Sequence, residues 1–332
     1  MRVIDEMHGT VVLSIEDINF LLNKIGWNKI ISRVGETFIE EAYGRTICPP
    51  KTIIPLGKFN NDYRCMPSTM SKYEDFIGTK IISCCADCPE KFNTPLAKGI
   101  YLLTDSETQN LILMFDSNLT TCCRTASASA TAVKYLTTFK RPFYRLGIIG
   151  CGQQALFHAL AISRVVDIFD IYLYDLNKVR ADGLATRLSD KFYPLVLSKE
   201  EVINNSDILI TLTPTKEPHL FGFDLPSGRP MTICAVGGDS EEKIEWEPQV
   251  LTIVDHYCDS LEQVSHTGTV SRALRDKIIR KENLKSLGKL MIGEEKLDES
   301  KKIKFFISTG VATQDLCVAI LLYENLGLLE EH

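Results

Sequence analysis

The spacing of apolar and polar positions divides the chain into two regions with different predicted folds. Over residues 51–115, apolar runs of strand length are separated by turn residues, and no helical pattern lies between them. After residue 145, strand-like runs alternate with helix-like stretches. Strict alternation of this kind is typical of a doubly wound parallel sheet. We therefore predict an antiparallel or mixed sheet followed by an α/β domain.

The two ends of the chain are predicted to be helical. Ser14 precedes a helix-spaced apolar pattern, and Asp17 stands where a capping box needs an acid. A second amphipathic helix is expected at about 31–42. The last helix, at about 313–326, is too apolar to stand free, so we expect it to pack on the N-terminal region.

The predicted α/β region begins with an Ala- and Ser-rich helix over 125–138. Strands are expected at 145–149, 168–174, 193–196, 208–212, 231–236 and 251–255, with helices at about 154–165 and 178–188. Residues 305–308 are also strand-like.

Composition and charge narrow the class of protein. A chain of 332 residues exceeds one ordinary core, and its 45% hydrophobic and 24% charged residues are normal for a globular protein. The net charge of −6 gives no basic footprint for nucleic acid or a membrane surface. The start of the sequence lacks a signal-peptide pattern, and apolar runs are strand-length, so a cytoplasmic protein is expected.

The 11 cysteines are expected to be reduced, because no secretory signal is visible. Cys84-Cys85-Ala86-Asp87-Cys88 contains one CxxC, whereas a structural zinc site usually needs two such pairs. The neighbouring Cys122 and Cys123 have the wrong spacing for the second pair. We predict no metal site and leave the role of the cluster open.

A glycine-rich turn indicates where a dinucleotide binds. Gly150-Cys151-Gly152-Gln153-Gln154-Ala155 follows a buried strand and opens a helix, so the backbone can approach a pyrophosphate. Asp175 ends the next strand, where a carboxylate binds the ribose 2′-hydroxyl and repels a 2′-phosphate. NAD is therefore favoured over NADP, although Arg180 leaves NADP possible. The alternative is a glycine turn in a sheet that binds no ligand.

Further motifs occur in a fixed order along the chain. They are Arg64-Cys65-Met66-Pro67-Ser68 ahead of Lys80, Cys123-Arg124-Thr125-Ala126-Ser127-Ala128, Ala235-Val236-Gly237-Gly238-Asp239, and Gly310-Val311-Ala312-Thr313-Gln314-Asp315. With the glycine turn, they resemble the ornithine cyclodeaminase/mu-crystallin family over roughly residues 11–328. The resemblance implies an α/β fold in which a Rossmann-type domain, residues 125–304, is inserted in a smaller α+β domain, residues 1–124 plus 305–332, for substrate binding and dimerisation.

The resemblance assigns roles that the residues themselves can support. Arg124 and Lys80 would hold a substrate carboxylate, because guanidinium binds carboxylate with two hydrogen bonds. An Arg in the first turn of a helix opposes the helix dipole, which favours an anionic partner over a surface ion pair. Lys51 stands where the family often has Arg, and a solvated Lys is the equal alternative. Asp239 would be the catalytic carboxylate, assisted by Lys80; a simple turn Asp is the alternative.

The remaining site residues are also expected from the resemblance. Thr211, Thr213, Val236, Gly237, Ser308 and Gly310 would border the cofactor, and Arg64 and Met66 the substrate. Asp315 is interpreted as a residue at a helix start rather than a catalyst. Arg64 replaces an acid that faces the distal amine in ornithine cyclodeaminase, and it would attract a second carboxylate instead.

Three functions remain open at this point. The first choice is an ornithine cyclodeaminase-type lyase that converts ornithine to proline and ammonia with recycled NAD. The second is a net NAD-dependent amino- or imino-acid oxidoreductase, of the alanine dehydrogenase or ketimine reductase kind or supplying diaminopropionate for siderophores or antibiotics. The third is a mu-crystallin-like binding protein. The expected partners are a small amino or imino acid and a second copy in a homodimer, with no nucleic acid and no membrane.

Overall fold

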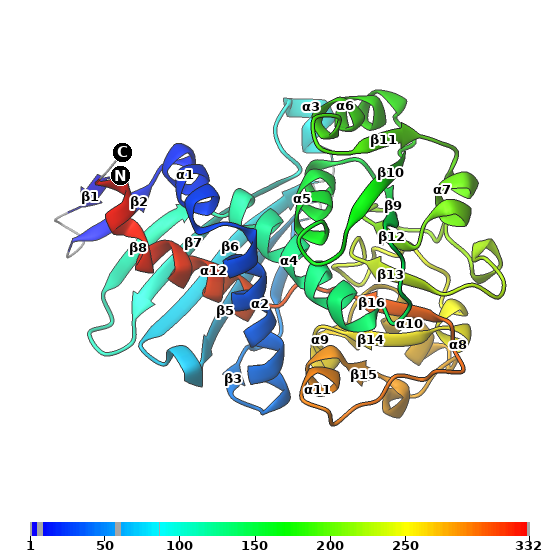
Figure 1. Cartoon of the computed structure of the whole chain (residues 1–332). Helices are drawn as coiled ribbons and strands as arrows, with labels where there is room; N and C mark the ends of the chain where they lie inside the picture. Colours follow the sequence, from blue (N-terminus) through cyan, green and yellow to red (C-terminus); the bar gives the residue numbers. More distant parts are fainter. Residues whose placement is uncertain (1, 5–8, 57–60, 86, 331–332) are drawn as a thin grey trace. The chain divides into compact units, whose positions relative to one another are not determined.

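The computed structural model describes residues 2–4, 9–56, 61–85 and 87–330 (Figure 1). The chain divides into two compact units. Unit 1 comprises Met1–Arg124 and Val311–His332, and unit 2 comprises Thr125–Gly310. Each unit is described separately below.

Unit 1 is built on a mixed sheet. Its strands are β1 (Arg2–Ile4), β2 (Thr10–Leu13), β3 (Thr46–Ile47), β4 (Thr52–Pro55), β5 (Asn61–Met70), β6 (Phe76–Cys85), β7 (Ala97–Asp105) and β8 (Leu111–Asp116). The order is β1-β2-β8-β7-β6-β5-β3, and β4 also pairs with β5. β2 and β8 run parallel, and the other pairs are antiparallel. The mixed sheet agrees with the sequence prediction.

Helices α1 (Ile15–Ile25), α2 (Trp27–Ala42) and α12 (Ala312–Glu324) belong to the same unit. Ser14 and Asp17 form the predicted capping box at the start of α1. α12 packs against α2, β5 and β6, as Figure 1 shows, and residues 312–322 are all buried. Arg33 and Glu324 add an ion pair between α2 and α12, with a shortest N–O distance of 2.8 Å. The apolar last helix therefore packs on the N-terminal region, as predicted.

Helix α4 spans Asn118–Leu136 and therefore begins before the predicted residue 125. The Asn118 N–H donates to Asp116 Oδ1 at 2.9 Å, so an Asx-type contact starts the helix. This signal was missed because the Ala-rich composition begins only later. As a consequence, Arg124 does not lie in the first turn, and the dipole argument for an anionic partner does not apply to it.

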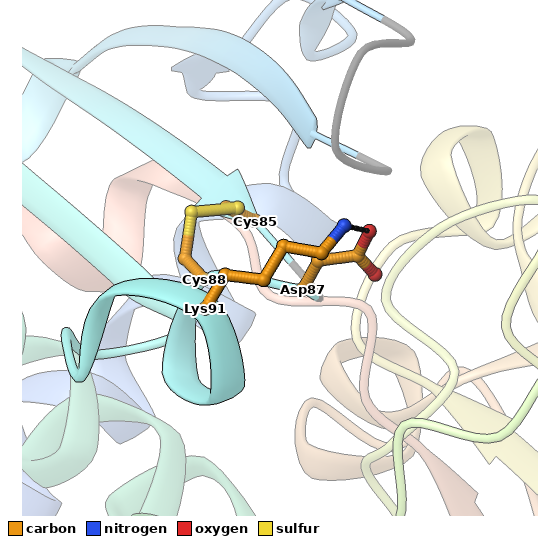
Figure 2. Close-up of a disulfide and its surroundings, with 4 residues drawn as sticks. All are labelled: Cys85, Asp87, Cys88 and Lys91. Atoms are coloured by element: carbon orange, nitrogen blue, oxygen red, sulfur yellow. Dashed lines mark hydrogen bonds and ion pairs between the residues drawn. A yellow bond between two sulfur atoms is a disulfide. The ribbon is translucent and has the colours of Figure 1, made fainter.

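One pair of cysteines departs from the expected reduced state. Cys85, the last residue of β6, forms a disulfide with Cys88, the first residue of the short helix α3 (Cys88–Phe92) (Figure 2). The two Cα atoms lie 5.3 Å apart, within disulfide range. Lys91 and Asp87 form an ion pair on the same turn at 3.0 Å. The expectation of reduced thiols was thus wrong for this pair.

Unit 2 is a parallel sheet with helical crossovers. Its strands are β9 (Tyr144–Ile149), β10 (Ile168–Tyr174), β11 (Tyr193–Val196), β12 (Ile208–Thr211), β13 (Met231–Ala235), β14 (Asp255–Cys258), β15 (Lys285–Ser286) and β16 (Ile303–Ile307). The order is β11-β10-β9-β12-β13-β16-β14-β15. The order reverses at β9 and β12, which is where doubly wound sheets bind ligands.

Unit 2 contains residues 125–136 of α4, and its other α-helices are short. They are α5 (Gln153–Ile162), α6 (Lys178–Leu188), α7 (Lys199–Asn205), α8 (Val250–Ile253), α9 (Leu261–Val264), α10 (Gly268–Arg275) and α11 (Leu287–Met291). Figure 1 shows α5 on one side of the sheet and α7 on the other. The doubly wound prediction is confirmed. Within the described ranges, no helix combines the length and apolarity needed to cross a bilayer.

Two details of unit 2 differ from the prediction. Residues 251–255 were expected to be a strand, but 250–253 form α8 and the strand follows as β14. Val250, Leu251 and Val254 are buried at helical spacing, and so short an apolar run fits either structure. Residues 305–310 were assigned to the other domain, yet β16 pairs with β13 and β14 and belongs to unit 2.

Candidate active site

Unit 1 contains a buried cluster of charged side chains. Lys80 comes from β6, Arg124 from α4 and Asp315 from the first turn of α12. Lys80 Nζ lies 2.7 Å from Asp315 Oδ2, and Arg124 Nε lies 3.2 Å from Asp315 Oδ1. The three residues are 1%, 6% and 2% exposed. Arg124 Nη1 also donates to Gln314 Oε1 at 3.3 Å. The fold thus joins the two predicted carboxylate-binding cations.

This cluster carries more positive than negative charge. Burial lowers the pKa of Lys80 to about 8, although the neighbouring Asp315 carboxylate favours the charged amine. Burial alone would raise the pKa of Asp315, but Arg124 and Lys80 outweigh it and hold that pKa below its ordinary value. Lys51 contributes to the same field, because its charge also disfavours protonation of Lys80. A buried excess of positive charge favours a nearby anion such as a carboxylate.

Further side chains lie on the same sheet face as Lys80, on the neighbouring strand β5. Met66 lies directly opposite Lys80, and both side chains therefore project from the same face. Arg64, two residues from Met66, shares that face and is 4% exposed. Its guanidinium binds Asp62 through two hydrogen bonds of 2.7 and 2.8 Å. The cation that sequence reasoning left for a second substrate carboxylate thus already has an internal carboxylate partner.

In unit 2, the glycine-rich turn joins β9 to α5. Gly150 adopts a φ of +97°, and a Cβ there would lie 3.0 Å from the Leu212 backbone, so this position requires glycine. A Cβ built on Gly152 meets nothing within 4 Å. Gly152 caps α5 without a side-chain hydrogen bond, Gln153 and Gln154 open the helix, and Ala155 is fully buried. An open approach to an uncapped helix N-terminus suits a phosphate group.

Asp175 anchors this turn from the end of β10. Its Oδ2 accepts the Cys151 N–H at 2.8 Å, and its Oδ1 accepts the Asn177 N–H at 2.8 Å. The carboxylate therefore lies at the glycine turn, as a ribose-binding acid must. It also stabilises the turn directly, which the sequence did not indicate.

Several predicted cofactor residues meet at the carboxyl ends of β12 and β13. The Thr211 hydroxyl donates to Glu245 Oε2 at 2.9 Å, and the Thr213 N–H donates to Oε1 at 2.7 Å. The Gly237 N–H donates to Glu245 Oε2 at 2.8 Å, and the Val236 N–H donates to the Thr211 carbonyl. Glu245 is the partner that holds these residues together, and it is not among the site residues expected from the sequence.

Asp239 lies on the turn that follows β13. Its Oδ1 is 2.7 Å from Lys243 Nζ, and the Asp239 side chain is 36% exposed. This carboxylate is therefore accessible and carries a cation beside it. A carboxylate with these properties can exchange protons with a bound substrate.

Ser308 and Gly310 belong to a loop that a second buried acid holds. Asp259, 1% exposed, accepts the Thr309 and Gly310 N–H groups on Oδ2 at 2.7 and 2.8 Å. The Ser308 hydroxyl reaches the same oxygen at 3.3 Å, and the Ser308 N–H donates to the Ala235 carbonyl. The loop follows β16 and thus lies at the carboxyl ends of the parallel strands, next to the end of β13. Asp259 was missed by sequence reasoning.

Comparison with known proteins identifies the family. A model of the ornithine cyclodeaminase/mu-crystallin family matches residues 9–328. The chain belongs to this family. Alanine dehydrogenase of Archaeoglobus fulgidus is 29% identical to it over 318 residues, 95% of either chain.

Two solved structures extend the comparison. An archaeal alanine dehydrogenase dimer with bound NAD has 29% identity and a TM-score of 0.87, covering 97% of both chains. Δ1-pyrroline-2-carboxylate reductase of Thermococcus litoralis, in complex with NADH and L-proline, has 26% identity and a TM-score of 0.85, covering 96% of this chain and 98% of that one. These family members are NAD-dependent enzymes of amino- and imino-acid chemistry.

The acids that organise the site had weak sequence signals. Asp315 and Gln314 stand in an otherwise apolar helix, and a buried acid at such a position needs a partner. That reasoning would have found Asp315, which was interpreted only as a helix-start residue. Among the described residues, no group of three or more His, Cys, Asp or Glu side chains is arranged for a metal ion.

Proposed function

We propose that this protein is an NAD-dependent enzyme that transfers hydride at the α-carbon of a small 2-amino or 2-imino acid. The observation that carries the proposal is the buried cluster of Lys80 and Arg124 around a single carboxylate, Asp315. The cluster lacks one negative charge, and the α-carboxylate common to amino and imino acids would supply it.

The residues of unit 2 fit a nicotinamide dinucleotide. The open approach at Gly152 and the N-terminus of α5 would receive the pyrophosphate, and Asp175 the adenine-side ribose. The negative charge of Asp175 favours NAD over NADP. When bound, the nicotinamide supplies the acceptor or donor of hydride.

The chain's own groups would hold the substrate and move its proton. Arg124 and Lys80 orient the α-carboxylate, which fixes the α-carbon relative to the protein. Oxidation of an amine to an imine releases a proton, and reduction of an imine consumes one. We assign this proton to Asp239, whose carboxylate is accessible and lies 2.7 Å from Lys243 Nζ.

We favour a net oxidoreductase because of Arg64. A cyclodeaminase acting on ornithine must accommodate a distal ammonium, and a buried guanidinium on the same face as Met66 and Lys80 opposes that charge. An ornithine cyclodeaminase-type lyase is the second candidate, because Asp62 is 24% exposed and could exchange Arg64 for a substrate ammonium.

The two reactions are separated by measuring two products. Amino acids and 2-oxo acids with ammonium are screened with NAD, NADH and their phosphorylated analogues, and both NADH and ammonia are followed. An oxidoreductase changes NADH in proportion to turnover, whereas a cyclodeaminase releases ammonia with no net NADH. Ornithine turnover with ammonia and constant NADH would reject the oxidoreductase. No turnover with any of these substrates would reject hydride transfer altogether.

We also propose that the protein is a homodimer that pairs through one face of the unit 1 sheet, the face that does not carry Lys80. Ile54, Tyr63 and Ile100 lie on the face opposite Lys80 and are 50%, 38% and 42% exposed. Apolar side chains gathered on one sheet face mark an interaction surface. Light scattering gives the mass, and Ile100→Lys is expected to produce monomers. A wild-type monomer would contradict the proposal.

A further inference from the structure

The Glu245 side chain is a buried junction between three segments of unit 2. Glu245 is 2% exposed. Its Oε1 accepts the N–H and hydroxyl of Thr213 at 2.7 and 2.8 Å, and its Oε2 accepts the Thr211 hydroxyl and Gly237 N–H at 2.9 and 2.8 Å. Each carboxylate oxygen therefore receives one backbone N–H and one hydroxyl. The segments after β12 and after β13 are both fastened to this one group.

The neighbouring donors fix the direction of these hydrogen bonds. The Trp246 indole N–H can only donate, and it reaches the Thr211 hydroxyl oxygen at 3.2 Å. The Thr211 proton is thus directed to Glu245. Thr213 Oγ1 also lies 2.8 Å from His219 Nε2, so His219 donates from Nε2 when Thr213 donates to Glu245. The network has a consistent proton arrangement with an ionised Glu245.

Gly237 packs so closely against the Glu245 carboxylate that it leaves no room for a side chain. A Cβ at Gly237 would lie 2.6 Å from Glu245 Cδ and 2.2 Å from the Thr213 carbonyl oxygen. Both approaches are impossible for a real side chain, so glycine is required here. The sequence analysis assigned this glycine to the cofactor, and the structure shows that it also packs against Glu245.

We propose that Glu245 is a positioning residue for Asp239. The Gly237 N–H bond to Glu245 closes the turn 237–245 at its base, and Asp239 lies within that turn, paired with Lys243. The turn is therefore held as a closed loop whose geometry places the Asp239 carboxylate. This inference rests on the proposed function only in assigning Asp239 the substrate proton; the closed turn itself does not depend on it.

Glutamine at this position cannot replace the carboxylate. Its amide has one acceptor oxygen and one NH₂ group, whereas Glu245 offers an acceptor to a backbone N–H on each side. In either orientation the NH₂ faces the N–H of Thr213 or of Gly237. Hydroxyls can rotate away from such a clash, but a backbone N–H cannot, so one segment is released.

The test compares Glu245→Gln with Glu242→Gln. Glu242 lies on the same turn, but its side chain is 74% exposed and pairs with Lys216 at the surface. Hydrogen exchange by mass spectrometry follows the peptide over residues 236–246, NADH fluorescence gives the cofactor Kd, and kinetics give kcat and KM. We expect E245Q to exchange faster in this peptide and to lose between about tenfold and a hundredfold in kcat. Its KM should stay within about threefold, its cofactor Kd should change by a smaller factor than kcat because Glu245 also holds Thr211 and Thr213, and E242Q should match the wild type.

Several results would overturn the inference. Unchanged exchange in E245Q would show that the turn is not closed by Glu245. Faster exchange with unchanged kcat would show that the turn does not place the catalytic carboxylate, and a selective loss of cofactor affinity would assign Glu245 to the cofactor loop instead. If E245Q does not fold, Glu245→Asp keeps the carboxylate but shortens the side chain, and it should give the same pattern more weakly. A wild type without any turnover rejects the proposed function, and the exchange comparison still decides whether Glu245 closes the turn.

Discussion

The buried charges of the two units are arranged in opposite ways. In unit 1, Lys80 and Arg124 share the single carboxylate of Asp315, so positive charge is in excess. In unit 2, Glu245 and Asp259 are saturated by N–H and O–H donors of neutral groups. A buried excess charge gains from binding an external ion, whereas a saturated carboxylate has nothing to gain. The first arrangement fits the proposed ligand site, and the second fits the proposed positioning role.

A third cluster, around Asp255, also carries more positive than negative charge. Asp255 in unit 2 also pairs with two cations, Lys285 and Lys304, at 2.7 and 3.0 Å. Lys285 is 27% exposed, and Lys304 also donates to the backbone carbonyls of Asp298 and Lys301. Solvent and carbonyl dipoles stabilise that excess charge. Charge excess therefore points to a ligand more strongly where both cations are buried, as Lys80 and Arg124 are.

The largest expected effect follows from removing the shared carboxylate of unit 1. Asp315→Asn leaves Lys80 and Arg124 buried without their counter-ion, so the free energy of unfolding should fall by about 3–5 kcal/mol. Acetate should recover part of the loss, because it can occupy the anion site. Asp259→Asn should also be destabilising, but without any acetate response. Urea unfolding of both variants with and without acetate measures these changes. An equal stabilisation of both variants by acetate would contradict the predicted difference between Asp315 and Asp259.

Removing a cation of the same cluster should affect binding rather than folding. Arg124→Met is expected to lower kcat/KM for the amino acid by about a hundredfold to a thousandfold, mainly through KM, because a buried carboxylate contact is lost. Its stability should change little, since the excess charge disappears with the guanidinium. Steady-state kinetics and thermal unfolding test both parts. Arg45→Met, which changes a half-exposed Arg of unit 1, is the control.

The excess charge should also be sensitive to pH. Burial lowers the pKa of Lys80 to about 8 from an ordinary 10.5, so the amine loses its proton above that pH. KM should then rise by up to about tenfold per pH unit. Between these two pKa values the unfolded chain binds more protons, so the Lys80 contribution to stability rises while binding falls. A KM profile from pH 6.5 to 10 checks this, and Lys80→Met should abolish the rise; an equal rise in that variant would assign it to another group.

A smaller change is expected at the glycine turn, where the carboxylate acts through its charge. Asp175→Asn removes the negative charge and leaves one acceptor for the N–H groups of Cys151 and Asn177. The preference for NADH over NADPH should shift toward NADPH by about tenfold. Fluorescence titration with each cofactor gives the two Kd values. Asp182→Asn, an exposed change on α6, should leave their ratio unchanged.

The smallest effect is expected from the disulfide. Cys85 lies five residues beyond Lys80 on β6, which is about 16 Å along a strand. Reduction of Cys85–Cys88 should expose two more thiols to alkylation and change KM by less than about twofold, because the bond is separated from Lys80 by five residues of an extended strand. Mass spectrometry after alkylation and kinetics with and without reductant test this. A larger shift in KM would show that the disulfide controls the anion site.

Short-range patterns in the sequence determined much of the fold. The capping box of Ser14 and Asp17, the parallel strands after residue 144 and the glycine turn all follow from residues close together in the chain. Such patterns act through local hydrogen bonds and side-chain periodicity, which a sequence displays directly. The prediction of a strand at 251–255 was wrong, because a run of four or five apolar residues fits a strand and a short helix equally well, and α8 forms there instead.

Tertiary structure alone decided the charge balance of the site. Asp315 meets Lys80 and Arg124 across separations of 235 and 191 residues, and no local pattern encodes that meeting. Glu245 reaches Thr211 across 34 residues, and Asp259 reaches Gly310 across 51. The sequence by itself showed which cations and acids were present, together with their order. Only the folded chain decided which acids neutralise a cation, which are saturated by backbone donors, and where positive charge remains in excess.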